Sequence, residues 1–253
     1  MLTTHDETLK LLRKHRLVAI LRGIDAPDAV KVAEALYRGG IRALEFTFDH
    51  SKTDCVEANC RCIRAVREQL LQKYPERKFI IVDTLSISAP QAILVLKAYE
   101  LAAQGKTIEE VADWLEQNKT RAQAFFTVDD LKYLQRGGRI SAAAAAMGGL
   151  LDLKPVILES KEGTLVSFAK VRGRKKAINF LVEQVLENIG DPKEAVGIVL
   201  HADVPEEAEA LKSALSAHLP EMEIRIDPVG PVIGAHCGPG TLAFCFLGKE
   251  RPQ

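Results

Sequence analysis

A carboxylate inside an apolar run is the first side chain of this sequence whose setting suggests chemistry. Glu45 lies between Leu44 and Phe46, and a carboxylate in such a strand is seldom buried without a partner. Arg22 and Arg42 are candidate partners. Because buried carboxylates often mark functional sites, Glu45 is a candidate site residue. A glutamate at a strand end that faces solvent or pairs with an arginine explains the pattern equally well.

Two serines and a histidine form a second set of candidates. Ser86 and Ser88 follow an apolar run that ends before Asp83, and Ser88 with Gln91 matches an S-x-x-Q capping box. His236 lies in GPVIGAHCGPG, where the glycines and prolines argue against continuous regular structure. Such a segment is suited to bringing backbone N–H groups and an imidazole to a ligand. A histidine there that bonds only the backbone is the simpler alternative.

Two further clusters have simple explanations. The basic stretch Arg172, Arg174, Lys175 and Lys176 is typical of a solvated helix start. A second cluster, Cys55, Cys60 and Cys62 with His50 nearby, matches no standard zinc spacing. We therefore expect free thiols, with no metal and no cofactor.

Composition and the chain start limit the function classes. Lys+Arg and Asp+Glu number 34 each, so the net charge points neither to nucleic acid nor to an anionic membrane surface. No apolar run approaches the ~18 residues of a membrane span. The first residues are polar and lack the apolar segment of a secretory signal. With five cysteines, an odd number, this favours a cytoplasmic protein with free thiols.

In the first third of the chain, apolar runs alternate with helical patterns. We expect strands at 17–21, 41–48 and 79–82, each followed by a helix. Strands alternating with helices favour a parallel sheet. The sequence therefore predicts that these three strands form one parallel sheet.

The regular alternation of predicted strands and helices ends near residue 121, where we place a domain boundary. Thr107 and Glu110 form a capping box, and Thr127 and Asp130 can cap a short helix that ends at two glycines. Residues 154–171 predict a β-hairpin with its turn at 161–163. Further along, the pattern predicts helices from about 175 to 189 and after Asp203, and strands at 196–200, 223–226 and 241–246.

The segment LVAILRGIDAPDAVKVAEALYRGGIRALEFTF resembles the start of the 2-keto-3-deoxy-6-phosphogluconate and phosphogalactonate aldolases. Those enzymes are (βα)8 barrels that cleave their substrate through a lysine Schiff base. The resemblance implies that Glu45 is the general acid/base and that Arg22 lies near the substrate carboxylate. The family's later motifs, including the Schiff-base lysine, are absent, and two βα units cannot close a barrel. We therefore expect no aldolase activity.

From about residue 71 to the end, the chain resembles the DegV family. The similarity rests on YPERKFIIVD, FFTVDDLKYLQRGGRIS, LLDLKPVI, KVRGRKKA and GPVIGAHCGPGTLAF, in the family's order and spacing. This resemblance implies a protein that binds a long-chain fatty acid between two α/β domains. In many Gram-positive bacteria such proteins present the lipid to a kinase and are not themselves the catalyst.

The DegV resemblance also implies roles for particular residues. His236, with Gly238, is similar to the family's histidine segment near the fatty-acid carboxylate. Ser86 and Ser88 lie where family serines approach the ligand, although Thr84 replaces the usual serine after Asp83. The basic stretch Arg172, Arg174, Lys175 and Lys176 is similar to a surface that meets the partner kinase or a phosphorylated head group.

Together these patterns predict an α/β hybrid of three segments. Residues 1–70 form an aldolase-like βαβα segment, 71–120 a DegV-like βα segment that completes the N-terminal subdomain, and 121–253 a DegV-like C-terminal domain. The usual N-terminal DegV motifs, which supply most hydroxyls to the carboxylate, are absent, so we expect weakened fatty-acid affinity. The alternatives are an aldolase or lyase remnant and a recombined chain with no activity.

Overall fold

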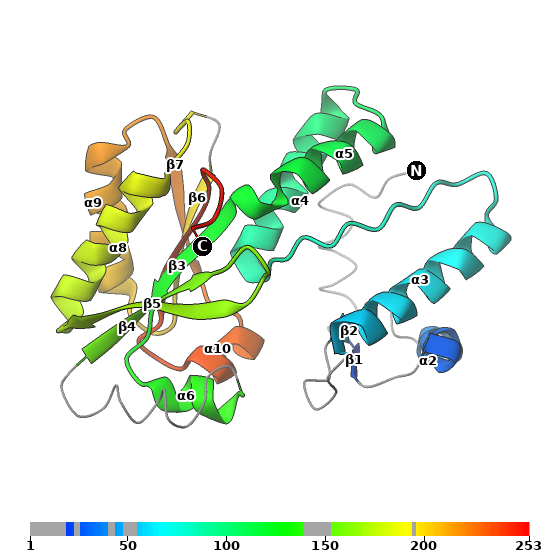
Figure 1. Cartoon of the computed structure of the whole chain (residues 1–253), viewed down its shortest axis with the longest axis horizontal. Helices are drawn as coiled ribbons and strands as arrows, with labels where there is room; N and C mark the ends of the chain where they lie inside the picture. The colour runs from blue at the N-terminus through cyan, green and yellow to red at the C-terminus, as the bar shows by residue number, and fades with distance from the viewer. Residues whose placement is uncertain are drawn as a thin grey trace. The chain divides into compact units, whose positions relative to one another are not determined.

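The chain folds into two compact units, Met1–Ile81 and Val82–Gln253. The computed structural model describes residues 19–22, 26–39, 44–47, 55–138, 153–193 and 196–252. Each unit has its own secondary structure (Figure 1). Among the described residues, no helix combines the length and apolar character needed to cross a membrane.

The first unit contains a βαβ arrangement followed by a long helix. Strand β1 (Ala19–Arg22) pairs in parallel with β2 (Leu44–Thr47), and helix α2 (Ala26–Arg38) connects them. Helix α3 (Cys55–Lys73) follows and packs on α2. A parallel pair needs such a crossover, so the alternation of apolar and helical patterns predicted this part correctly.

The third predicted strand, at 79–82, is wrong. These residues form irregular backbone, and Ile80 and Ile81 are exposed. The backbone oxygen of Phe79 accepts a hydrogen bond from Arg67 Nε at 2.6 Å rather than from a strand. An apolar run becomes a strand only where a sheet edge can pair with it, and the described sheet of this unit consists of β1 and β2.

The second unit is built on a six-stranded sheet in the order β5-β4-β3-β8-β6-β7. Among its strands, only β6 and β7 pair in parallel. Every residue of the central strand β8 is buried, as expected for a strand covered on both faces. The strands are β3 (Ala122–Thr127), β4 (Leu153–Glu159), β5 (Leu165–Arg172), β6 (Val196–His201), β7 (Glu223–Pro228) and β8 (Leu242–Leu247).

Helices cover both faces of this sheet (Figure 1). Helices α8 (Arg174–Asn188) and α9 (Pro205–His218) lie on one face, and α4 (Ser88–Ala103) lies on the other. Helix α5 (Ile108–Asn118) and the 3-10 turn η1 (Lys119–Arg121) lead from α4 into β3. The short helices α6 (Leu131–Arg136) and α10 (Pro231–Cys237) pack together.

Aromatic rings pack between the sheet and α8. Phe125 of β3 contacts Phe246 of β8 and Phe168 of β5, with ring centroids 6.2 and 6.3 Å apart. Phe168 in turn contacts Phe180 of α8 at 6.2 Å. Such pairs add to the stabilisation from burial alone, so this face of the sheet is held to α8 by aromatic packing.

Several local predictions are confirmed. The capping box of α5 forms, with Glu110 N donating to Thr107 Oγ1 at 3.2 Å and Thr107 N donating to Glu110 Oε2 at 2.8 Å. Asp130 caps α6 by accepting from Lys132 N at 2.9 Å. Strands β4 and β5 form the predicted antiparallel hairpin. Each of these signals depends on residues close in sequence.

Two local predictions are wrong, and one strand was missed. Ser88 does not cap α4, because the helix begins at Ser88 itself and its N-cap, Ile87, makes no side-chain bond. The segment GPVIGAHCGPG contains a helix, α10, with Pro231 in its first turn and Gly238 (φ 78°) ending it. Proline and glycine at those positions start and stop a helix. Strand β3, the sheet's centre, was not predicted from AQAFFT.

Candidate functional site

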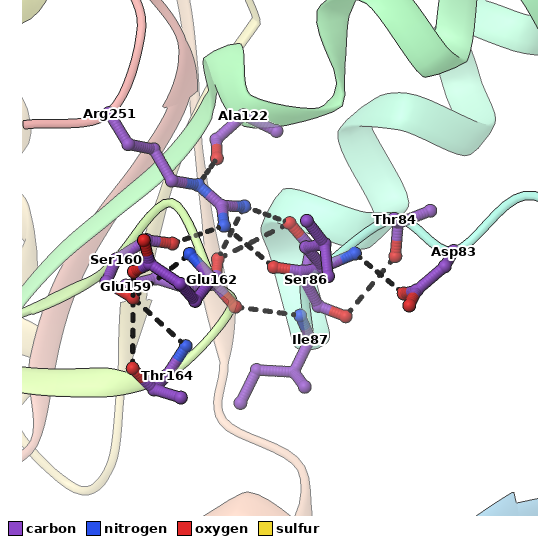
Figure 2. Close-up of polar contacts among 11 residues, drawn as sticks. Asp83, Thr84, Ser86, Ile87, Ala122, Glu159, Ser160, Glu162, Thr164 and Arg251 are labelled. Atoms are coloured by element: carbon purple, nitrogen blue, oxygen red, sulfur yellow. Dashed lines mark hydrogen bonds and ion pairs between the residues drawn. The ribbon is translucent and has the colours of Figure 1, made fainter. Parts of the chain in front are cut away.

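A buried ion pair holds three distant parts of the second unit together. The side chains of Arg251 and Glu159 are 0% and 2% exposed, and Arg251 Nη2 lies 2.9 Å from Glu159 Oε2 (Figure 2). The guanidinium also donates to three backbone oxygens, those of Leu85 (2.7 Å), Ala122 (2.8 Å) and Ser160 (2.9 Å). A buried charge is tolerated when it is paired and its remaining donors are bonded, and this arginine meets both conditions.

Strand geometry directs Glu159 toward the α4 side. Leu158 pairs in register with Phe125, whose ring packs beneath α8, and side chains alternate along a strand. Glu159 therefore points to the opposite face, where the segment before α4 lies. There Glu159 Oε1 accepts from Ile87 N at 3.2 Å, and Oε2 accepts from Ser86 Oγ at 3.4 Å.

Burial dominates the electrostatics of this pair. Desolvation raises the pKa of Glu159 from 4.5 to about 7, against the opposing effects of the Arg251 charge and the hydrogen bonds from Ile87 and Ser86. Desolvation likewise lowers the pKa of Arg251. On the same face, burial raises the pKa of the Cys245 thiol well above its usual range, so this cysteine is an inert core residue.

Residues 83–87 form a tight turn against this pair. Asp83 Oδ1 accepts from Leu85 N at 3.0 Å, and Thr84 Oγ1 donates to the backbone oxygen of Ser86 at 3.4 Å. Leu85 has φ 49°, a left-handed conformation that is unfavourable for a branched side chain. A β-carbon at Gly163, in the β4–β5 turn, would lie 2.9 Å from the Leu85 oxygen. The hairpin turn therefore needs glycine in order to pack on this segment.

The two serines predicted to approach a ligand lie in different settings. Ser86 is half-buried, and its hydroxyl bonds both members of the ion pair, donating to Glu159 and accepting from Arg251 Nη2 (Figure 2). Ser88 is exposed at the first residue of α4 with φ 56°. Both stay candidate ligand residues, but the hydroxyl of Ser86 already has internal partners.

His236 lies in α10, where this helix packs on α6. The imidazole is half-buried and occupies the space that a β-carbon at Gly137 would need. Gly238 follows α10 directly and is buried, and the ring of Tyr133 occupies the space that a β-carbon at Gly238 would need. The backbone oxygen of Gly238 accepts from Thr241 Oγ1 at 2.7 Å. Two glycines thus allow α6 and α10 to approach closely around His236.

His236 and Ser86 lie on segments that join β3 at different places. Arg251, which bonds Ser86, also bonds Ala122 at the start of β3. The segment of His236 leads through Thr241 into Leu242, which pairs with Thr127 at the other end of β3. Ser86 also bonds Glu159, which follows Leu158, the partner of Phe125 in the middle of β3. The two candidate residues thus belong to segments that attach to different parts of β3.

The predicted basic stretch divides into one internal and three exposed cations. Arg174 is 17% exposed and bonds Glu207 Oε2 through Nη2 at 2.6 Å and through Nε at 3.0 Å. It also donates to the Gly240 oxygen at 2.6 Å and lies 3.8 Å from Asp129. The other three cations, Arg172, Lys175 and Lys176, are exposed.

The candidate residues of the first unit are placed only by their backbone. Glu45 pairs in register with Ile20, and Arg22 with Thr47. The predictions for the Glu45 and Arg22 side chains, and for His50, lie outside the described residues. Of the three clustered cysteines, Cys62 is buried in α3.

Sequence reasoning missed the buried ion pair. Glu159 ends the apolar run of β4, and Arg251 follows the apolar β8 after four residues. Charges at strand ends are normally solvated, which is why neither residue stood out. The available signal was a charged residue at the end of the apolar run PVIL in β4, and another four positions after the end of the apolar β8.

Comparison with known proteins agrees with the architecture of the second unit. The family model described as "Uncharacterised protein, DegV family" matches residues 61–249. A DegV domain-containing protein of Clostridium perfringens is 39% identical over 222 residues, which cover 88% of this chain and 75% of the relative. Several relatives from Streptococcus pyogenes are matched over 63% of their length.

These matches begin earlier than the predicted start near residue 71. Only 183 residues follow residue 70, so the clostridial match extends into the first 70 residues. The family model also begins within α3. The aldolase-like interpretation of residues 1–70 stays a prediction.

Two solved structures have the same fold over most of this chain. A fatty acid binding DegV family protein from Streptococcus agalactiae is 25% identical, with a TM-score of 0.66, and covers 97% of this chain and 84% of its own. A DegV family protein from Thermus thermophilus, described for its fatty acid binding, is 29% identical, with a TM-score of 0.65, and covers 88% and 77%. The mixed α/β fold, the family model and the identity to the clostridial relative agree, and this chain belongs to the DegV family.

Proposed function

We propose that this chain binds a long-chain fatty acid and carries it, rather than transforming it. The observation that supports this most directly is the likeness to two DegV proteins described as fatty acid binding, at 25% and 29% identity. A carrier needs an apolar site for the tail and a donor for the carboxylate. Each buried methylene contributes about 0.8 kcal/mol, although ordering the chain on binding offsets part of that gain.

We place the carboxylate near His236 and Gly238. The imidazole is half-buried beside two close helices, and it can donate a hydrogen bond to an anion. The hydroxyl of Ser86 bonds Arg251 and Glu159. Ser86 and Ser88 remain candidates for contact with other parts of the ligand.

We further propose that affinity is weaker than is usual in the family. The sequence lacks the T-D-S-x-x-D-L, T-S-Q-P and S-x-L-S-G-T-Y segments that the family resemblance leads us to expect near the start. An anionic head group in an apolar site needs such hydroxyl donors. The aldolase-like origin of residues 1–70 belongs to the same proposal, as the replacement of those segments.

Fatty-acid binding is tested by native mass spectrometry and by titration with a fluorescent fatty acid. Protein purified from a bacterial host should carry lipid of fatty-acid mass, and His236→Ala should weaken binding by about tenfold, the equivalent of one charge-assisted hydrogen bond. His218→Ala is the matched control, because His218 is exposed in the last turn of α9. Equal affinity of the parent and His236→Ala would remove His236 from the site. No binding by the parent would reject the proposed function.

The rival aldolase activity has a separate test. The described backbone keeps a parallel βαβ unit with Glu45 in its second strand, which is the one feature that favours this rival. We expect borohydride with pyruvate to trap no adduct, because the family's Schiff-base lysine is missing. A covalent adduct on one lysine, lost when that lysine is changed, would overturn this expectation.

A further inference from the structure

The Arg251–Glu159 pair joins segments that are far apart in the sequence. Glu159 ends β4, Arg251 follows β8, and both bond residues of the turn at 83–87. That turn begins two residues after Ile81, where the first compact unit ends. The pair therefore acts on the first turn of the second unit.

Arg251 and Glu159 make several hydrogen bonds to the turn at 83–87. Arg251 donates to the Leu85 oxygen at 2.7 Å and to the hydroxyl of Ser86, and Glu159 accepts from Ile87 N at 3.2 Å (Figure 2). Three consecutive residues are thus held by two side chains that are themselves almost fully buried. The left-handed Leu85 persists only if its surroundings fix it.

Stability alone does not explain why charged residues occupy this position. Well-packed apolar residues often stabilise a core as well as a buried ion pair does, whereas removing one partner leaves an uncompensated charge. An apolar pair at 159 and 251 would, however, offer nothing to Leu85, Ser86 or Ile87. The arrangement thus favours a role in fixing the turn.

We propose that Arg251 and Glu159 are positioning residues that fix the turn at 83–87, and with it Ser86 and the start of α4, in the geometry that ligand binding requires. They do so without contact with the ligand, since both side chains are buried. The ligand part of this inference rests on the proposed fatty-acid function, whereas the ordering of the turn does not.

Hydrogen exchange of the Ile87 amide measures the ordering of the turn directly. The test compares Glu159→Leu, Arg251→Met and the double variant with the parent, at pH 8. Each single variant should lose stability, and the double variant should recover most of it because no unpaired charge remains. Ile87 should still exchange about tenfold faster or more in the double variant, which corresponds to the loss of a hydrogen bond to a charged group.

Leu211→Ala is the matched control for a general loss of stability. Leu211 is fully buried in α9, on the other face of the sheet. It should destabilise the unit without selective acceleration at Ile87. If the double variant protects Ile87 as well as the parent does, or if Leu211→Ala accelerates Ile87 equally, the inference is overturned. Should these variants fail to fold, the conservative Glu159→Gln decides, because it removes the charge that accepts from Ile87 N; unchanged exchange at Ile87 would then contradict the inference.

Titration with the fluorescent fatty acid tests the ligand part. The double variant should bind the fatty acid about tenfold more weakly than the parent. Adding Ser86→Ala to the double variant should lower the affinity little further, because the effects of substitutions at residues that act through one another are not additive. Unchanged affinity in the double variant overturns the ligand part. If the parent itself binds no fatty acid, the proposed function fails, and the exchange data alone judge the positioning role.

Discussion

At the scale of single residues, burial of an ionisable side chain of the acidic or basic type distinguishes Glu159 and Arg251 from the other described residues of the second unit. Each side chain can carry a charge, and it lies at a position from which water is nearly excluded. Exposed pairs such as Arg225 with Glu223, at 2.8 Å, have similar distances but contribute little, because solvent screens them. The same contact distance therefore has different consequences at the two sites.

The raised pKa of Glu159 predicts a dependence of stability on pH. Its pKa is raised from 4.5 to about 7 by burial, so between these values the folded chain holds a proton that the unfolded chain releases. The contribution of this group is complete below about pH 4.5 and declines as pH rises toward about 7, by at most about 1.4 kcal/mol per pH unit. Urea unfolding at several pH values should show this decline in the parent and lose it in Glu159→Gln.

The matched control for this experiment is Glu223→Gln. Glu223 is exposed on β7, so its removal should leave the shape of the pH profile unchanged. A parent and a Glu159→Gln variant with parallel stability profiles between pH 5 and 7 would contradict the expectation that Glu159 titrates in this range.

At the scale of elements, the β4–β5 hairpin is fitted to the turn that precedes α4. Gly163 has φ 76°, and its missing side chain leaves room for the Leu85 oxygen. Gly163→Ala combines backbone strain with a steric conflict, and we expect a loss of about 1–3 kcal/mol. Thermal or urea unfolding measures it.

Gly105→Ala serves as the comparison for Gly163. Gly105 also has a positive φ, of 85°, but a β-carbon there would meet nothing within 4 Å. Its substitution should therefore cost the backbone strain alone, about 1 kcal/mol. Equal losses at the two glycines would mean that the contact with Leu85 adds nothing.

At the scale of the whole molecule, the second unit presents cations at the junction of β5 and α8. Arg172, Lys175 and Lys176 are exposed, while Arg174 between them is bonded inward to Glu207. We propose that the three exposed cations contact an acidic surface on a partner, a fatty-acid kinase subunit by the family resemblance. Arg174 would instead hold α8, α9 and the loop of Gly240 together.

Charge reversal separates these two roles. Lys175→Glu with Lys176→Glu should weaken kinase binding or acyl-phosphate formation by tenfold or more, with a steep dependence on salt, and should leave fatty-acid affinity unchanged. Lys212→Glu, on α9, is the control for net charge. If the variant with both lysines reversed binds the kinase and supports acyl-phosphate formation as the parent does, this surface is not the contact.

The sequence determined those features that depend on neighbours within a few residues. The Thr107–Glu110 box, the Asp130 cap and the hairpin turn at Gly163 are each fixed by short-range hydrogen bonds or a required backbone angle. The family motifs from YPERKFIIVD onward likewise indicated the DegV fold. All of these patterns can be recognised without knowledge of the tertiary contacts.

Tertiary structure alone decided the features whose partners lie far along the chain. Residues 79–82 have strand composition but find no sheet edge, whereas AQAFFT becomes β3 because β4 and β8 pair with it on both sides. Arg251 meets Leu85 and Glu159 across 166 and 92 residues. The physical reason is that strand pairing and buried ion pairs derive their free energy from partners that only the fold brings together. A local sequence pattern does not identify those partners.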